Sequence, residues 1–281
     1  MKVLLAGATG AVGRPLTKAL IAAGHEVLAL ARSEDSARAV VAQGARAVRA
    51  DAMDRDGLLR ALDGLSADAV IHELTALAKP RRTLDADDPS TALRVRGTAH
   101  LLEAAEALGA ERFLTQSMAL GYGYTDHGDR VLTEDDPFGV KQGGVADFVI
   151  DGLVSTEEQT LAAGGIALRY GLFYGPGTWL DPAASRLPVP WDGGGVMAWI
   201  HVDDAAVATV AALERGTAGR PYNVVDGHPA TWGEKAHGRR VPGWMLRLMV
   251  PYLGALMIDT SLRVSNARAV EELGWTPAYP A

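Results

Sequence analysis

The sequence contains no cysteine. This absence excludes disulfide bonds, thiolate metal sites and cysteine nucleophiles. The formal net charge is -7 and no basic stripe is visible, which argues against a nucleic-acid binder. No stretch approaches the ~20 apolar residues that a membrane-spanning helix needs. The apolar start of the chain breaks at Gly7 and Gly10, too early for the apolar core of a signal peptide, so we expect a cytoplasmic protein.

What the chain does have is a regular alternation of short apolar runs and Ala/Leu-rich segments. Its 281 residues are 48% hydrophobic, which is an ordinary globular composition. The apolar runs predict buried strands at residues 3–6, 27–31, 45–48, 69–72, 113–115 and 166–170. The segments between them have helical spacing and predict helices at residues 14–23, 36–43, 55–62, 91–108 and 146–163. The alternation predicts an α/β fold with a Rossmann-type parallel sheet and helices on both faces.

The character of the sequence changes after Tyr174. Residues 175–195 are rich in Gly and Pro and predict a loop; a short strand at 199–202 and a helix at 203–214 follow. We predict a nucleotide-binding domain at 1–174, rejoined by 199–224, a lid loop at 175–198, and a small, mostly helical substrate cap at 225–281. The cap is rich in Trp, Met and Leu. These side chains either pack the core of the cap or line a pocket for a flat apolar ligand.

A glycine motif follows the first predicted strand and opens a helix. It reads Gly7-Ala8-Thr9-Gly10-Ala11-Val12-Gly13, with Arg14 next. In this pattern the first glycine permits a tight turn, the second lets the backbone approach a pyrophosphate, and the third lets helix and strand pack closely. Free N–H groups at the helix N-terminus then face the phosphate. The position between strand and helix favours a dinucleotide site over a turn without a ligand.

The end of the second predicted strand indicates which dinucleotide is bound. An acidic residue there would bind the ribose hydroxyl of NAD, whereas an arginine accepts the 2′-phosphate of NADP. This strand is followed by Arg32 and Ser33, which suit a phosphate, so we predict NADP(H). The alternative is that Arg32 is a solvated surface charge. Asp51, after the third strand, either accepts from the adenine amino group or caps a loop.

Further motifs accompany the glycine loop along nearly the whole chain. They are Val70-Ile71-His72, Gly97-Thr98, Leu168-Arg169-Tyr170-Gly171-Leu172-Phe173-Tyr174-Gly175-Pro176-Gly177, Trp199-Ile200-His201-Val202-Asp203-Asp204 and Glu272-Leu273-Gly274-Trp275-Thr276-Pro277. With these motifs the chain resembles the extended short-chain dehydrogenases/reductases, the group of nucleotide-sugar epimerases, dehydratases and their relatives. The resemblance implies cofactor contacts at Asp51, Ala52, Leu74, Thr75, Ala76, Gly171, Leu172 and Phe173. It also implies a homodimer packed through the helices near 91–108 and 146–163.

The sequence departs from this family in its catalytic residues. Family members use a Tyr as acid/base, a Lys four residues on that lowers the pKa of the Tyr, and a Ser/Thr that holds the substrate oxygen. No tyrosine here has a lysine four residues on. The Tyr and Lys positions fall on Ile150 and Val154, and the Ser/Thr position falls on Met118, beside Ser117. Arg94 replaces the Asn often found before the Gly-Thr pair.

Few groups remain that could hydrogen bond or protonate a substrate carbonyl. Ser117 is the candidate for a hydrogen bond to the carbonyl oxygen; equally, its hydroxyl could satisfy the strand end or the cofactor. His72 and His201 titrate in the useful range, but their places at a strand end and before a helix favour structural roles. Asp147 and Asp151 flank the vacated positions and fit a solvated face or a cap. No metal site is expected.

The apolar replacements favour a flat, apolar substrate over a sugar nucleotide. We predict substrate contacts from Met118, Ile150, Val154, Tyr174, Trp179 and Trp191. The resulting hypothesis is an NADPH-dependent ketoreductase of a polycyclic aromatic ketone whose neighbouring phenol supplies the proton, similar to the atypical reductases that tailor angucyclinone-type polyketides. A non-catalytic NADP(H) sensor that signals to a partner protein is the first alternative. A nucleotide-sugar epimerase or dehydratase is the second, and it would require the residues that are absent.

Overall fold

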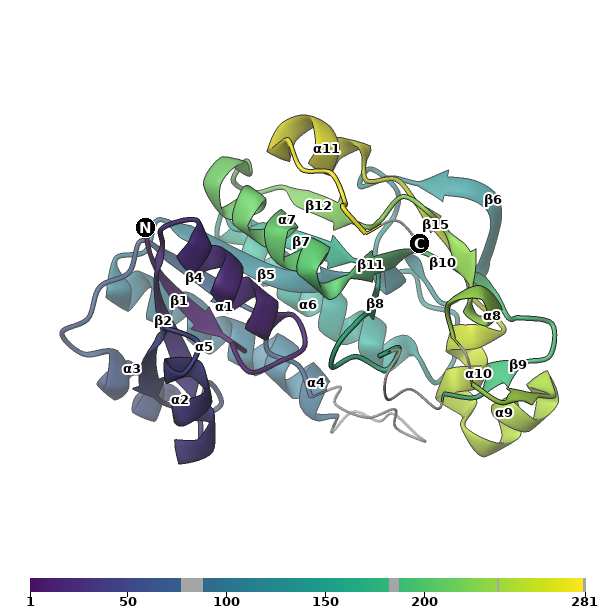
Figure 1. The fold of residues 1–281 in the computed structure, drawn as a ribbon, viewed down its shortest axis with the longest axis horizontal. Helices are drawn as coiled ribbons and strands as arrows, with labels where there is room; N and C mark the ends of the chain where they lie inside the picture. Colours follow the sequence, from purple (N-terminus) through teal and green to yellow (C-terminus); the bar gives the residue numbers. More distant parts are fainter. Residues whose placement is uncertain (77–87, 182–186, 237, 280–281) are drawn as a thin grey trace.

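Seven parallel strands form one sheet in the computed structural model, which describes residues 1–76, 88–181, 187–236 and 238–279. The strand order is β12-β7-β5-β4-β1-β2-β3, and every neighbouring pair is parallel. The strands are β1 (Lys2–Ala6), β2 (Glu26–Ala31), β3 (Arg46–Arg49), β4 (Ala69–His72), β5 (Arg112–Met118), β7 (Ile166–Tyr170) and β12 (Pro221–Val224). The predicted Rossmann-type sheet is confirmed (Figure 1).

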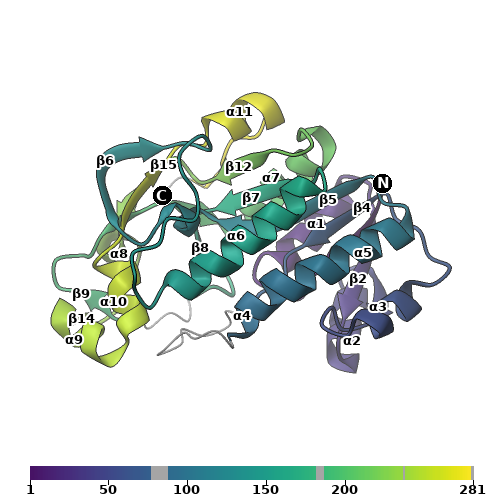
Figure 2. The same ribbon diagram turned by 180° about the vertical axis from the view of Figure 1, so that it is seen from behind.

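Helices cover both faces of the sheet, as Figures 1 and 2 show from opposite sides. One face carries α1 (Gly13–Ala22), α2 (Glu34–Val41), α7 (Val202–Arg215) and α11 (Ala267–Leu273), and the other carries α3 (Arg55–Leu62), α5 (Thr98–Leu108) and α6 (Asp147–Ala162). Alternate residues of a strand point to opposite faces. In β1, therefore, Val3 and Leu5 join the core under α1 and α7, whereas Leu4 joins the core under α3 and α5.

The central helix that we predicted over 91–108 is longer and less regular. It begins as α4 (Pro89–Ala92), widens into a π-helical turn (Leu93–Gly97) and continues as α5. The Asp88 carboxylate starts it by accepting the backbone N–H of Ser90 at 2.8 Å. Single π-helical turns inside α-helices often lie at functional sites. This one holds Arg94, whose guanidinium is buried and whose Nε and Nη2 have no hydrogen-bond partner within the described residues.

Short strands and helices from two parts of the chain lie at one end of the sheet. One part lies between β5 and α6, and the other follows β7. β8 (Leu172–Tyr174) pairs with β11 (Trp199–His201), and β6 (Asp126–Leu132) pairs with β15 (Ser261–Val264). The C-terminal part also holds α8 (Trp232–Lys235), α9 (Gly243–Met249) and α10 (Pro251–Met257). Two further pairs are β9 (Val189–Pro190) with β14 (Arg240–Val241) and β10 (Val196–Met197) with β13 (Ala230–Thr231).

Not all of the large apolar cap residues share one role. Trp232, Tyr252 and Met257 are buried and belong to the core between the cap and the end of the sheet, whereas Trp244 and Leu248 in α9 are exposed. Of the predicted lid, residues 182–186 lie outside the described part of the chain, as do 237 and 280–281 of the predicted cap. The division into domains and the action of the loop as a lid stay predictions. In the described ranges, no helix has the length and apolar character required to span a bilayer.

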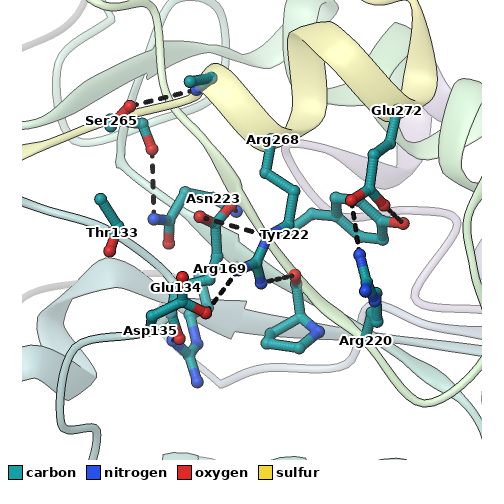
Figure 3. A network of polar contacts seen from close by, with 12 residues as sticks. Thr133, Glu134, Asp135, Arg169, Arg220, Tyr222, Asn223, Ser265, Arg268 and Glu272 are labelled. Carbon is teal, nitrogen blue, oxygen red and sulfur yellow. Dashed lines mark hydrogen bonds and ion pairs between the residues drawn. The ribbon is translucent and has the colours of Figure 1, made fainter.

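A polar network ties the C-terminal segment to the edge of the sheet (Figure 3). Asn223 in β12 donates from its backbone N–H to Glu134 Oε1 at 2.8 Å and from its side chain to the carbonyl of Ser265 at 3.2 Å. Arg169 in β7 donates from Nη1 to the carbonyl of Glu134 at 3.4 Å. Segments that are far apart in the sequence are thereby joined around the end of two neighbouring strands.

Candidate functional site

A cavity of about 640 Å³ runs from the glycine loop to the cap. This volume lies within the ~300–1,000 Å³ of ordinary small-molecule sites. The loop after β1 and the start of α1 form one end, where Thr9, Gly10 and Arg14 are among the lining residues. The other end is walled by Trp179, Trp199, Trp232, Tyr252 and Leu256. The cavity therefore lies at the carboxyl ends of the parallel strands, where open α/β sheets bind their ligands.

The backbone of the glycine loop fits the expected phosphate cradle. Gly7 has a φ of +105°, and a Cβ there would lie 2.7 Å from the carbonyl carbon of Glu73. A Cβ on Gly13 would lie 2.0 Å from the carbonyl oxygen of Gly7. Both positions therefore accept only glycine. Of the predicted cofactor residues, Thr9, Gly10, Ala11, Val12, Gly13 and Arg14 line the cavity, as do Thr75, Leu172 and Phe173 farther along the chain.

The residues predicted for the adenosine end lie outside the cavity lining. Arg32 is exposed at the end of β2. The Ser33 hydroxyl caps α2, because it accepts the backbone N–H of Ser36 at 3.2 Å. Asp51 accepts the backbone N–H of Met53 at 2.9 Å, which is the loop role left open above. Contacts of these residues with a dinucleotide stay predictions, as do those of Ala52, Leu74, Ala76 and Gly171, which also lie outside the lining.

The prediction that Ser117 hydrogen bonds a substrate carbonyl is not supported by its position. Ser117 is fully buried, and its hydroxyl donates to Glu157 Oε1 of α6 at 2.5 Å. Glu157 in turn pairs with the buried Arg169, whose Nη2 lies 2.8 Å from its Oε2. The reason is strand parity. β5 extends to Met118, so Gln116 and Met118 point into the cavity, while Ser117 points to the opposite face.

One wall of the cavity, beside the positions predicted to be vacated, is apolar. Met118, Leu120 and Val149 line the cavity. Ile150 and Val154, the predicted substrate contacts on α6, lie outside the lining: Ile150 is fully buried, and Val154 packs against Gly139. Successive helical positions are rotated by about 100°, so Val149 faces the cavity while its neighbour Ile150 does not.

The predicted aromatic contacts separate into two groups. Trp179 lines the cavity, but Trp191 and Tyr174 do not. Trp191 is 66% exposed. The Tyr174 hydroxyl donates to the carbonyl of Tyr279 at 2.7 Å, and its ring packs edge-on against His201. The prediction of substrate contacts for Trp191 and Tyr174 therefore has no support from their positions.

The two histidines have structural partners. His201 Nδ1 accepts the backbone N–H of Asp203 at 3.2 Å at the start of α7. His72 Nδ1 accepts the backbone N–H of Leu74 at 3.2 Å, and burial lowers the pKa of His72 to about 4. His72 is therefore neutral near pH 7.

Over the described ranges, no cluster of three or more His, Asp or Glu side chains could hold a metal ion.

Sequence reasoning missed Glu73, which lines the cavity and is 6% exposed. It follows β4 directly and accepts the hydroxyl of Tyr170 at 3.0 Å. Burial raises the pKa of Glu73 to about 8, and the hydrogen bond from Tyr170 offsets only part of that rise. The available signal was an acidic residue placed directly after a buried strand, at the edge where ligands bind.

The sequence and the structure were compared with known proteins, and the sequence matches one family. Residues 3–225 match the sequence profile of the NAD dependent epimerase/dehydratase family. A 3-diazoavenalumate denitrifying reductase of Streptomyces sp is 39% identical over an alignment 308 positions long, covering 100% of this chain and 97% of that protein. A 2-alkyl-3-oxoalkanoate reductase of Stenotrophomonas maltophilia strain K279a is 28% identical, covering 95% and 80%. The crystal structure of UDP-glucose 4-epimerase from Thermus thermophilus, complexed with NAD, has a TM-score of 0.76 at 22% identity, covering 100% and 95%. The last comparison shows a shared fold.

Proposed function

Because the chain belongs to the NAD dependent epimerase/dehydratase family, we propose that it is an NADPH-dependent reductase of a flat, largely apolar aromatic molecule. The family's nucleotide cofactor is NAD(P). The preference for NADP(H) is part of the proposal and rests on the guanidinium of Arg32 at the end of β2. When bound, the nicotinamide supplies a hydride. The glycine loop would hold the pyrophosphate, with Thr9, Gly10 and Arg14 at its end of the cavity.

The observation that carries the proposal is the apolar wall beside an intact cofactor cradle. Met118, at the family's Ser/Thr position, lines the cavity together with Leu120 and Val149, and no tyrosine in the sequence has a lysine four residues on. Together with the tryptophans at the cap end, they suit an aromatic ring system better than a sugar. A wall of this kind binds and orients the substrate but offers no proton. A substrate that brings its own acid, or that requires none, fits a site without the Tyr–Lys pair.

A polycyclic aromatic ketone of the polyketide type meets this condition if a phenol lies beside the carbonyl. The ketone takes up a hydride at carbon and a proton at oxygen and becomes an alcohol. A neighbouring phenol can hydrogen bond to the carbonyl oxygen and donate that proton, and solvent then restores it. Orientation of the carbonyl carbon by the cavity walls supplies the enzyme's share of the rate enhancement.

An aromatic diazo compound is a second candidate, favoured by the relative at 39% identity. That protein is named a denitrifying reductase of 3-diazoavenalumate. An aryl diazonium carbon that takes up a hydride releases N₂, which leaves with the electron pair of the broken C–N bond. This reaction consumes no proton and therefore needs no Tyr–Lys pair as a proton donor. Both candidates are reductions of a flat aromatic molecule by the same cofactor.

The test follows NADPH oxidation at 340 nm against polycyclic hydroxyketones with and without a neighbouring phenol, aryl diazo compounds, simple ketones and nucleotide sugars. We expect turnover only with the phenol-bearing polycycles or the diazo compounds. Two tryptophan variants form a matched pair. Trp179→Ala, inside the cavity, should raise KM about fivefold, because a lost aromatic contact is worth ~1 kcal/mol. Trp191→Ala, outside the cavity, should leave KM unchanged.

Three results would contradict the proposal. Turnover of nucleotide sugars would favour an epimerase or dehydratase. NADPH binding by fluorescence without oxidation of any compound would favour the redox sensor. Equal effects of the two tryptophan variants would place the substrate elsewhere.

A further inference from the structure

Glu73 occupies an unusual place directly beneath the glycine loop. It follows the last residue of β4, and its backbone N–H donates to the carbonyl of Ala6 at 2.8 Å. A Cβ built on Gly7 would lie 3.1 Å from the Cβ of Glu73. The side chain therefore begins beside the turn that the cofactor's pyrophosphate is expected to approach.

Among the described residues, the carboxyl group has one hydrogen-bond partner and one oxygen left over. Its Oε1 accepts the Tyr170 hydroxyl at 3.0 Å, and that hydroxyl lies 2.6 Å from Thr209 Oγ1 in α7. Glu73 Oε2 is buried and has no hydrogen-bond partner within the described residues. Because Glu73 lines the same cavity as Thr9 and Gly10, a ligand bound there would lie beside it, and no hydrogen bond within the described residues would compete for Oε2. A buried polar atom without a partner is costly unless a ligand or water satisfies it.

The charges around Glu73 decide which form of the carboxyl can face a cofactor. Tyr170 is the titratable group in contact with it, and its own pKa is raised well above the usual value by burial. Arg14, Lys18 and Asp203 line the same cavity. His72, its neighbour in β4, points to the opposite face, where its ring bonds the backbone of Leu74. No cation is a hydrogen-bond or ion-pair partner of Glu73 within the described residues, so an ionised carboxylate would be uncompensated and would repel a pyrophosphate.

We propose that Glu73 is a cofactor-positioning residue that acts in its neutral form, donating its carboxyl hydrogen from Oε2 to the dinucleotide bound at the glycine loop. The inference rests on the proposed nicotinamide cofactor. It makes cofactor binding depend on pH: the neutral carboxyl adds a hydrogen bond, whereas the ionised carboxylate opposes the phosphate charge. The burial that raises the pKa of Glu73 to about 8 keeps the group neutral at pH 7.

The test is fluorescence titration of NADPH against the intact protein between pH 7 and 9.5, above the ~6 at which the 2′-phosphate itself titrates. For the wild type we expect the Kd to rise with pH, by up to about tenfold per unit once the carboxyl ionises. Glu73→Gln keeps a neutral donor and should give a Kd that varies much less. Tyr170→Phe removes the hydrogen bond that lowers the pKa of Glu73, so the rise should move to higher pH. Circular dichroism checks that each variant is folded.

The outcomes separate the two proposals. A wild-type Kd that does not change with pH would overturn the role of Glu73 and leave the cofactor assignment intact. Parallel pH curves for the wild type and Glu73→Gln would do the same. No NADPH binding at any pH would overturn the proposed function, and this inference with it. If one variant fails to fold, the wild-type curve together with the other variant still tests the role of Glu73.

Discussion

Replacing Glu157 with Gln should destabilise the protein by about 3–5 kcal/mol, because it leaves the buried Arg169 without its counter-charge. Glu157 and Arg169 are 3% and 4% exposed as whole residues, and their shortest contact is 2.8 Å. Ser117→Ala removes a hydrogen bond to the same carboxylate. Such bonds to charged groups contribute about 1.5–3 kcal/mol. Glu157 Oε1 still accepts Arg169 Nε at 3.0 Å, so we expect a loss at the lower end of this range, about 1.5–2 kcal/mol.

Urea unfolding of the three proteins measures these losses. Thr115→Val is the matched control: it lies in the same strand and on the same face, and its hydroxyl pairs with the neutral Thr156 at 3.2 Å, so its cost should be smaller. Because Ser117 points away from the cavity, Ser117→Ala should leave kcat nearly unchanged. A loss of about 10²-fold or more in kcat at unchanged stability would refute this reasoning and make Ser117 a catalytic residue.

Three further predictions concern the cofactor and Glu73. Arg32→Ala should weaken NADPH binding much more than NADH binding, and equal losses would contradict the assignment of NADP(H). Gly13→Ala should reduce NADPH affinity at least tenfold and lower the urea midpoint, since its Cβ would collide with the loop, whereas Gly144→Ala, whose Cβ meets nothing within 4 Å, should behave as wild type. In the folded protein Glu73 keeps its proton up to a pKa of about 8, whereas in the unfolded chain it loses the proton near its ordinary pKa of 4.5. Between these two pH values the folded state binds one proton more than the unfolded state. Stability should therefore fall as pH rises through that window, by up to ~1.4 kcal/mol per unit, and less so in Glu73→Gln; parallel urea midpoints would contradict this.

Much of the fold could be predicted from local patterns. β4 and α3 have the bounds that the sequence predicted, because a short apolar run and a capped amphipathic segment each specify their own conformation. The glycine loop was also predictable, since its backbone demands depend on neighbours in the sequence and in one adjoining strand. The π-helical turn at 93–97 was not, because it depends on packing against other elements.

The sequence by itself determined the parallel sheet, the cofactor cradle and the absence of a Tyr–Lys pair, because these follow from periodicity, glycine spacing and residue identity. Only the tertiary structure decided which side chains share the cavity. Side chains alternate between the two faces along β5, which includes both residues, so Met118 points into the cavity and Ser117 points away from it. Packing placed Trp179 inside and left Trp191 outside. Membership of a cavity depends on elements that meet only after folding, and no local pattern contains that information.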